Sequence, residues 1–175
     1  MKKNEKMIIV GPSGSGKDFL LNKLKEEGFK TSVKTTTRPR RDGEMDGVNY
    51  HFKTNEEFNR LLESDNILIN QEFYVKGDKW QYGYDTKGFT SSNVFILTPG
   101  ELNKLNKELR KECFVVYLDI DEKVRRKRLL SRNDNNDSID RRVLNDRDDF
   151  KLFADYDLKI SDPYFDHESI LGLMY

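Results

Sequence analysis

A glycine-rich turn between an apolar run and a helix constrains the fold of this chain more than any other feature. The run Met7-Ile8-Ile9-Val10 leads directly into Gly11-Pro12-Ser13-Gly14-Ser15-Gly16-Lys17-Asp18. Glycines let backbone N–H groups turn inward around an anion, the helix start adds positive potential, and the lysine adds a mobile charge. The order strand, glycine loop, lysine and helix predicts a site for the phosphates of a nucleoside triphosphate. Its residues are Gly11, Pro12, Ser13, Gly14, Ser15, Gly16, Lys17 and Asp18.

The last residue of this loop departs from the usual pattern. Such loops end in Lys-Ser or Lys-Thr, whose hydroxyl binds Mg²⁺, whereas here Asp18 follows Lys17. A carboxylate is a good ligand for a hard cation, so Asp18 is a candidate Mg²⁺ ligand. An acid in the first turn of a helix is also stabilised by the helix dipole, and this structural role is an equal alternative.

Length and charge narrow the class of protein. A chain of 175 residues suits one domain with its own core. Its 31 basic and 31 acidic residues cancel, which argues against general binding to nucleic acid or to a membrane surface. The single cysteine, Cys113, excludes an internal disulfide. No apolar run approaches the length of a membrane span. We therefore expect a cytoplasmic protein without nucleic-acid or membrane partners.

Strand and helix signals alternate along much of the chain and predict an α/β fold. Segments 93–97 and 114–118 are typical of buried strands, and 157–161 is expected to be a last short strand. Leu102, Leu105 and Leu109 predict one helix between the first two strands. Strands that alternate with helices favour a parallel sheet covered on both faces. A further helix is expected to start at Ser138.

The segment from about 34 to 90 breaks this alternation and is interpreted as an insert. Thr54 and Glu57 have the spacing of a capping box at the start of a helix. Ile67–Phe73 and Trp80–Tyr84 are expected to be strands joined around Gly77-Asp78.

An arginine-rich stretch inside the insert is a second candidate for binding phosphate. Residues 35–50 hold Arg38 and Arg41 on turns marked by one proline and two glycines. Planar guanidinium groups match phosphate oxygens better than lysine does. We predict that Arg38, Arg41 and Tyr50 bind a phosphate-bearing second substrate, and that Glu44 orients a guanidinium or meets a base edge.

A third cluster of arginines flanks the polar tract at 133–137. Its members are Arg125, Arg126, Arg128, Arg132, Arg141 and Arg142. As a set on either side of a polar loop they favour a cover that approaches a transferring phosphoryl group and excludes water.

These motifs resemble the guanylate kinase family of nucleoside monophosphate kinases over nearly the whole chain. The phosphate loop, the pattern Thr-Thr-Arg-x-x-Arg-x-Gly-Glu-x-x-Gly-x-x-Tyr at 36–50 and the pair Tyr82-Gly83 occur in family order. Arg128-Leu129, Arg132 and Arg142 follow in the same order.

The resemblance implies the fold and the site. The fold would be that of a phosphate-loop nucleoside monophosphate kinase, with a parallel five-stranded core sheet and helices on both faces (about 1–33, 91–130 and 154–175). A mixed α/β insert (about 34–90) would bind the monophosphate, and a helical lid would span about 131–153. ATP with Mg²⁺ would be the donor, and the chain would act as a monomer or homodimer. The catalytic residues would be Lys17, Arg38, Arg128, Arg132 and Arg142, with Arg128 and Arg132 also binding ATP. The acceptor residues would be Thr37, Arg38, Arg41, Glu44, Tyr50, Asn70, Glu72, Tyr82, Tyr84 and Arg142.

The implied reaction is transfer of a phosphoryl group from ATP to a nucleoside 5′-monophosphate, with GMP or dGMP as the leading acceptor. The chain departs from the family where the base is read. The strand before Tyr82-Gly83, where the family usually carries one glutamate, reads Ile69-Asn70-Gln71-Glu72-Phe73, and Tyr84 replaces the family's Ser or Thr. Three alternatives stay open. They are a deoxynucleoside monophosphate kinase with another base preference, a ribose 1,5-bisphosphate kinase, which the Lys-Asp loop ending favours, and a non-catalytic guanylate-kinase-like binding module.

Overall fold

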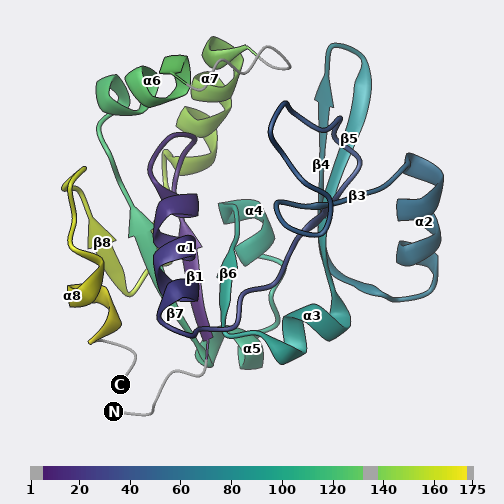
Figure 1. The fold of residues 1–175 in the computed structure, drawn as a ribbon, viewed down its shortest axis with the longest axis horizontal. Helices are drawn as coiled ribbons and strands as arrows, with labels where there is room; N and C mark the ends of the chain where they lie inside the picture. The colour runs from purple at the N-terminus through teal and green to yellow at the C-terminus, as the bar shows by residue number, and fades with distance from the viewer. Residues whose placement is uncertain (1–5, 132–137, 173–175) are drawn as a thin grey trace. The chain divides into compact units, whose positions relative to one another are not determined.

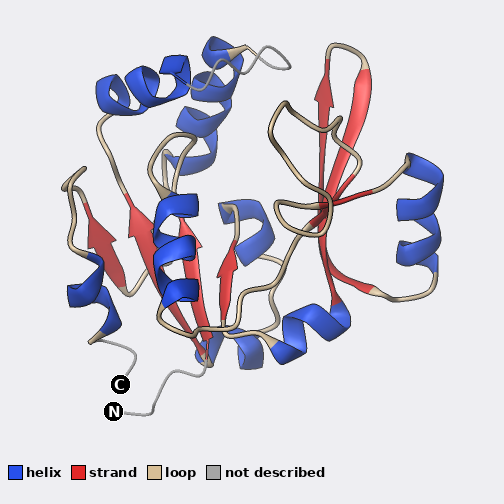
Figure 2. Ribbon diagram, in the orientation of Figure 1, coloured by secondary structure: helices blue, strands red, loops and turns tan. Residues whose placement is uncertain are grey.

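The computed structural model describes residues 6–131 and 138–172, which divide into two compact units. The core unit combines Met1–Thr31 with Asn93–Tyr175, and the insert unit is Ser32–Ser92. Each unit contains its own sheet. Figure 1 labels the elements of both units, and Figure 2 distinguishes their helices from their strands.

The core unit is built on a parallel sheet in the order β6-β1-β7-β8. Its strands are β1 (Lys6–Val10), β6 (Val94–Ile96), β7 (Cys113–Leu118) and β8 (Leu158–Ile160). Its helices are α1 (Lys17–Glu26), α4 (Pro99–Leu102), α5 (Lys107–Lys111), α6 (Glu122–Ser131), α7 (Ile139–Phe150) and α8 (His167–Leu171). Within the described ranges, no helix is long and apolar enough to cross a membrane.

Helices cover both faces of this sheet, as the alternation of sequence signals predicted. On one face, Met7 and Val116 belong to a buried cluster with Leu24 of α1 and Ile170 of α8. On the opposite face, the ring of Tyr117 stacks on Phe150 at the end of α7, with 5.4 Å between the ring centroids. Val116 and Tyr117 are neighbours in β7 and point to opposite faces of the sheet, so β7 is buried on both sides.

The prediction of a five-stranded core sheet is wrong. Within the described residues, the core sheet has four strands. Beside β6, a single isolated bridge joins Thr31 to Val94. The chain passes into the insert unit directly after Thr31. This segment therefore leaves the sheet before a continuous ladder with β6 can form.

The predicted helix through Leu102 and Leu109 is also corrected, to two short helices. The backbone of Asn106 is extended, with φ −66° and ψ 158°, and its side chain accepts a hydrogen bond from the Leu109 N–H. That contact caps a new helix, α5, in place of continuing α4. Local capping by an amide side chain thus overrides the helical spacing of the leucines.

The insert unit has a second sheet, in the order β3-β2-β5-β4. Its strands are β2 (Thr35–Thr36), β3 (His51–Phe52), β4 (Ile67–Val75) and β5 (Asp78–Asp85), and its helices are α2 (Asn55–Glu63) and α3 (Thr86–Ser91). The capping box predicted at Thr54 is present at the start of α2. From α2, Phe58 reaches the sheet, and its ring lies 3.1 Å from where a Cβ on Gly83 would stand.

A tight turn between β4 and β5 sets the register of the longest strand pair in the insert unit. Val75 pairs with Asp78, so the connection is the two residues Lys76 and Gly77. Both have positive φ, 52° and 90°, as hairpin turns of the primed types require in order to match strand twist. This register decides which side chains of β4 share a face with those of β5.

We expect Phe58→Ala to destabilise the protein strongly, because this ring is fully buried between α2 and the sheet. Loss of a buried phenylalanine side chain costs about 3–5 kcal/mol. Urea unfolding followed by circular dichroism measures the change. Tyr74→Ala is the control, since Tyr74 belongs to the same sheet and is 70% exposed. Equal losses for the two variants would contradict the packing described for Phe58.

Candidate active site

The phosphate loop connects β1 to α1 in the core unit and depends on glycine at defined positions. Gly14 and Gly16 have φ of +78° and +106°, which L side chains rarely adopt. A Cβ on Gly14 would lie 2.8 Å from the backbone oxygen of Arg125, and one on Gly11 would lie 2.9 Å from the backbone oxygen of Leu118. The loop therefore lies directly against the backbone of its neighbours.

The Lys17 ammonium lies over the first residues of the loop. Its Nζ donates hydrogen bonds to the carbonyl oxygens of Gly11, at 2.7 Å, and Pro12, at 3.1 Å. The next residue, Asp18, is exposed in the first turn of α1. A cation and a helix start thus meet at the loop, the combination that binds phosphate.

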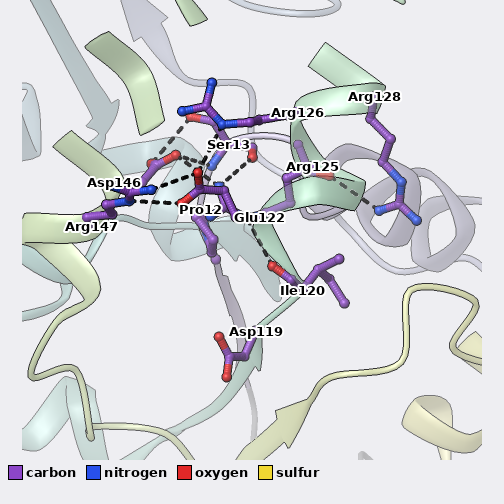
Figure 3. A network of polar contacts seen from close by, with 12 residues as sticks. Pro12, Ser13, Asp119, Ile120, Glu122, Arg125, Arg126, Arg128, Asp146 and Arg147 are labelled. Atoms are coloured by element: carbon purple, nitrogen blue, oxygen red, sulfur yellow. Dashed lines mark hydrogen bonds and ion pairs between the residues drawn. The ribbon is translucent and has the colours of Figure 1, made fainter. Parts of the chain in front are cut away.

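Arginines of α6 bind the backbone carbonyls of the loop. Arg128 donates from Nη1 to the oxygens of Gly14 and Ser15, at 3.3 and 3.2 Å, and from Nη2 to Pro163 O at 2.7 Å. The side chain of Arg125 donates to Ser13 O at 3.1 Å. Figure 3 shows both arginines leaving α6. Arg128 was expected to bind ATP. In this structure it bonds the phosphate loop and supports the shape of that loop.

Arg132 and Arg142 were also expected to be catalytic. Arg132 lies outside the described residues. Arg142 is half-buried on α7, four residues before Asp146. Asp146 was missed by sequence reasoning, although its carboxylate accepts a hydrogen bond from the Ser13 N–H at 2.9 Å. No local motif marks this aspartate, because its partners come from other elements.

Ion pairs join α6 to α7, the two helices that flank residues 132–137. Glu122 of α6 accepts from Arg126 and from Arg147 of α7, each at 2.9 Å, and Arg126 also pairs with Asp140 at 2.7 Å. The Arg147 and Arg126 hydrogen bonds lower the pKa of Glu122 to about 2. Figure 3 shows Glu122 beside Arg147.

The insert unit contains a buried ion pair built from the second motif. Arg38 has a side chain only 1% exposed, and its Nη2 donates to both oxygens of Glu44, at 2.7 and 3.0 Å. The rings of Tyr50 and Phe52 lie 5.2 and 5.8 Å from its guanidinium carbon. Glu44 also accepts from the Arg41 N–H at 2.8 Å. Of the two roles expected for Glu44, the structure contains the orienting one.

Burial and hydrogen bonding act in opposite directions on the acids of this cluster. Burial raises the pKa of Glu44, but the bonds from the Arg38 side chain and the Arg41 backbone outweigh it, so the pKa is lowered from 4.5. Burial likewise raises the pKa of Tyr82, and nearby Arg38 and Arg41 only partly offset it. The carboxylate is therefore ionised and the phenol protonated at neutral pH.

The structure separates the expected acceptor residues of the β4–β5 hairpin. Gln71 stands opposite Tyr82, whereas Asn70 and Glu72 stand opposite Gly83 and Gln81. Directly opposite residues of an antiparallel pair share a face. Asn70 and Glu72 therefore lie on the other face from Tyr82. Gln71, which sequence reasoning did not select, lies on the same face as Tyr82.

Three other expected acceptor residues, Glu72, Thr37 and Tyr84, have contacts within the insert unit. Glu72 is paired with Lys79 at 2.6 Å. The hydroxyl of Thr37 accepts from the Gln81 N–H at 2.9 Å, which ties β2 to β5. Tyr84 is buried and packs edge-on against Phe89 of α3, with 6.5 Å between ring centroids.

A phosphate loop on a parallel sheet, with a separate arginine–tyrosine cluster, defines a phosphate-loop nucleotide-binding protein. The family model described as guanylate kinase matches residues 3–83, which include both motifs. A guanylate kinase from Campylobacter jejuni is 31% identical, with 88% of this chain and 78% of the relative aligned. One from Alkalilimnicola ehrlichii is 29% identical over 91% and 81% of the two chains.

A solved structure of a guanylate kinase shares the fold of this chain. The crystal structure of guanylate kinase from Anaplasma phagocytophilum is similar in fold, with a TM-score of 0.68, 21% identity, and 98% of this chain and 83% of that chain covered. The protein described here belongs to the guanylate kinase family.

The lowered pKa of Glu44 predicts a dependence of stability on pH. A depressed pKa contributes stability that is fully present above the ordinary value of 4.5 and is lost as the pH falls through the folded value. We expect Glu44→Gln to cost about 1–3 kcal/mol at pH 7, and the difference from the parent to shrink at pH 3. Thermal unfolding at both pH values measures it. Glu63→Gln, at an exposed position of α2, is the control; a Glu44→Gln difference that does not change with pH would refute the prediction.

Proposed function

We propose that this protein transfers the γ-phosphoryl group of ATP to the 5′-phosphate of GMP or dGMP. An oxygen of the acceptor phosphate bonds to the γ-phosphorus, the bond from that phosphorus to the β–γ bridging oxygen breaks, and ADP leaves with GDP or dGDP as the second product. The observation that carries the proposal is the intact phosphate loop, with the Lys17 ammonium held over its start. Family membership supports the guanine acceptor over a ribose phosphate and over a non-catalytic module.

The core unit supplies the donor site in this proposal. Backbone N–H groups of the loop face the phosphates of ATP, and Lys17 exchanges its carbonyl partners for phosphate oxygens. Arg128 maintains the loop through its carbonyls, and Arg142 adds positive charge during transfer. In-line transfer requires positioning and charge neutralisation more than covalent chemistry by the protein.

Asp18 is the residue that fits a Mg²⁺ ion brought in with ATP. Its carboxylate is exposed in the first turn of α1, next to Lys17, and hard cations prefer oxygen ligands. The described part of the chain has no group of three or more His, Cys, Asp or Glu placed to hold a metal. Phosphate oxygens and water would therefore complete the coordination, as is common for Mg²⁺. The ion would neutralise charge on the phosphates.

The insert unit supplies the acceptor site. Arg41 is more accessible than the buried Arg38, so we assign Arg41 the direct contact with the acceptor phosphate and Arg38 the support of Glu44 and Tyr50. The hydroxyls of Tyr50 and Tyr82 donate to the same phosphate. Asn70 and Glu72 are left out of this assignment because they lie on the opposite face from Tyr82.

A panel of acceptors tests the proposed reaction. ADP release is measured with ATP and each common ribo- and deoxynucleoside monophosphate, and with ribose 1-phosphate and ribose 1,5-bisphosphate. We expect turnover with GMP and dGMP. Lys17→Ala should lower kcat about a hundredfold or more, because one preorganised donor to the transition state is lost. Lys25→Ala, exposed at the other end of α1, is the matched control. Turnover of ribose phosphates alone, or of no acceptor, would exclude the proposal.

Arg41→Ala is predicted to affect the acceptor selectively. A charged hydrogen bond contributes about 1.5–3 kcal/mol, so we expect the KM for GMP to rise about tenfold or more while the KM for ATP stays unchanged. Steady-state kinetics with each substrate varied in turn measure both constants. Arg40→Ala removes the same charge from the exposed neighbouring position and should leave both constants near those of the parent. An equal rise in both constants for Arg41→Ala would contradict the assignment.

A further inference from the structure

A carboxylate from α7 holds the outer backbone of the phosphate loop. Asp146 accepts from the Ser13 N–H at 2.9 Å and from the Ser13 hydroxyl at 3.3 Å. Both contacts link residues 133 positions apart in the sequence. Figure 3 shows Asp146 and Ser13 side by side, joined by dashed lines.

A buried arginine from α6 completes this contact. Arg125 donates from Nη1 to Ser13 O at 3.1 Å and to Asp146 Oδ2 at 3.4 Å, and from Nε to Ile120 O at 2.9 Å. The side chains of Arg125 and Asp146 are 7% and 13% exposed. The N–H, the hydroxyl and the carbonyl of Ser13 are thus all bonded to one ion pair, which is itself bonded to the segment after β7.

The charges of the pair suit a site for an anion. The Asp146 carboxylate alone would repel phosphate, but the Arg125 guanidinium next to it compensates the charge. The residue after Ser13 also lies against α6, because the backbone oxygen of Arg125 is 2.8 Å from where a Cβ on Gly14 would stand. Ser13 is therefore bonded to both α6 and α7, and Gly14 lies against α6, through contacts that use no charge of the loop itself.

We infer that Arg125 and Asp146 are positioning residues that pre-organise the phosphate loop for ATP, an inference that rests on the proposed function. A loop ordered before the ligand arrives loses less conformational entropy on binding, so affinity rises without any new contact to the ligand. The same pair is one of the contacts that orient α7. Arg142 lies four residues before Asp146, on the same face of that helix. The contacts of Arg125 and Asp146 with Ser13, called the clamp below, therefore also contribute to the direction in which Arg142 leaves α7.

The test compares ATP affinity in the full chain and its variants. We expect Asp146→Ala to raise the Kd for ATP, measured by calorimetry, about tenfold or more, and to leave the KM for GMP unchanged. Asp146→Asn keeps an oxygen that accepts from the Ser13 N–H, so the rise should be smaller. Asp148→Ala removes a carboxylate from an exposed position of the same helix and is the matched control. A purely structural role would reduce the active fraction and the Tm without changing the Kd of the folded protein.

The outcomes separate the two proposals. If the parent chain binds no ATP at millimolar concentration, the proposed function fails and takes this inference with it. If the parent binds ATP and Asp146→Ala binds it equally well or more tightly, the clamp is refuted while the proposed function stands. Should Asp146→Ala fail to fold, Asp146→Asn decides: a raised Kd supports the clamp, and an unchanged Kd overturns it.

Discussion

Close contact between the phosphate loop and its neighbours is the constraint on which the core unit depends. The loop has room for no side chain at Gly14, which meets the Arg125 backbone, or at Gly11, which meets the backbone of Leu118 at the end of β7. A loop placed this close to α6 and β7 also brings Ser13 within reach of the Arg125–Asp146 pair. The glycines thus serve two purposes: they open the backbone to an anion, and they let the surrounding elements hold that backbone still.

Ion pairing inside the protein explains how two arginines can be buried in a chain rich in charge. Arg38 and Arg125 are both nearly buried, and each is bonded to a carboxylate and to a backbone carbonyl. Burial of an unpaired guanidinium would be strongly unfavourable. Arg38 therefore shapes the turn that carries it, and Arg125, from α6, shapes the phosphate loop. Arg41 and Arg142 are more accessible than either of them.

Sequence reasoning succeeded where the determinants are local and failed where they are distant. The phosphate loop and the capping box at Thr54 are short patterns whose geometry depends on a few adjacent residues. The prediction of one helix through Leu102–Leu109 was wrong because the side chain of Asn106 caps a new helix. The clamp joins Ser13, Arg125 and Asp146 from three elements, and no spacing in the sequence indicates that these elements meet.

The placement of Asn70 and Glu72 on the face opposite to Tyr82 has a different origin, because its determinant was local and was passed over. Gly77 marks the turn between β4 and β5, and the two-residue connection Lys76-Gly77 makes Val75 the partner of Asp78. Counting outward from that pair places Gln71, and neither of its neighbours, opposite Tyr82. Polarity had favoured Asn70 and Glu72, but in a strand the face is decided by parity, and a shift of one residue turns every side chain to the other side. Once the turn is assigned, the residues of β4 that share a face with Tyr82 follow from the register alone.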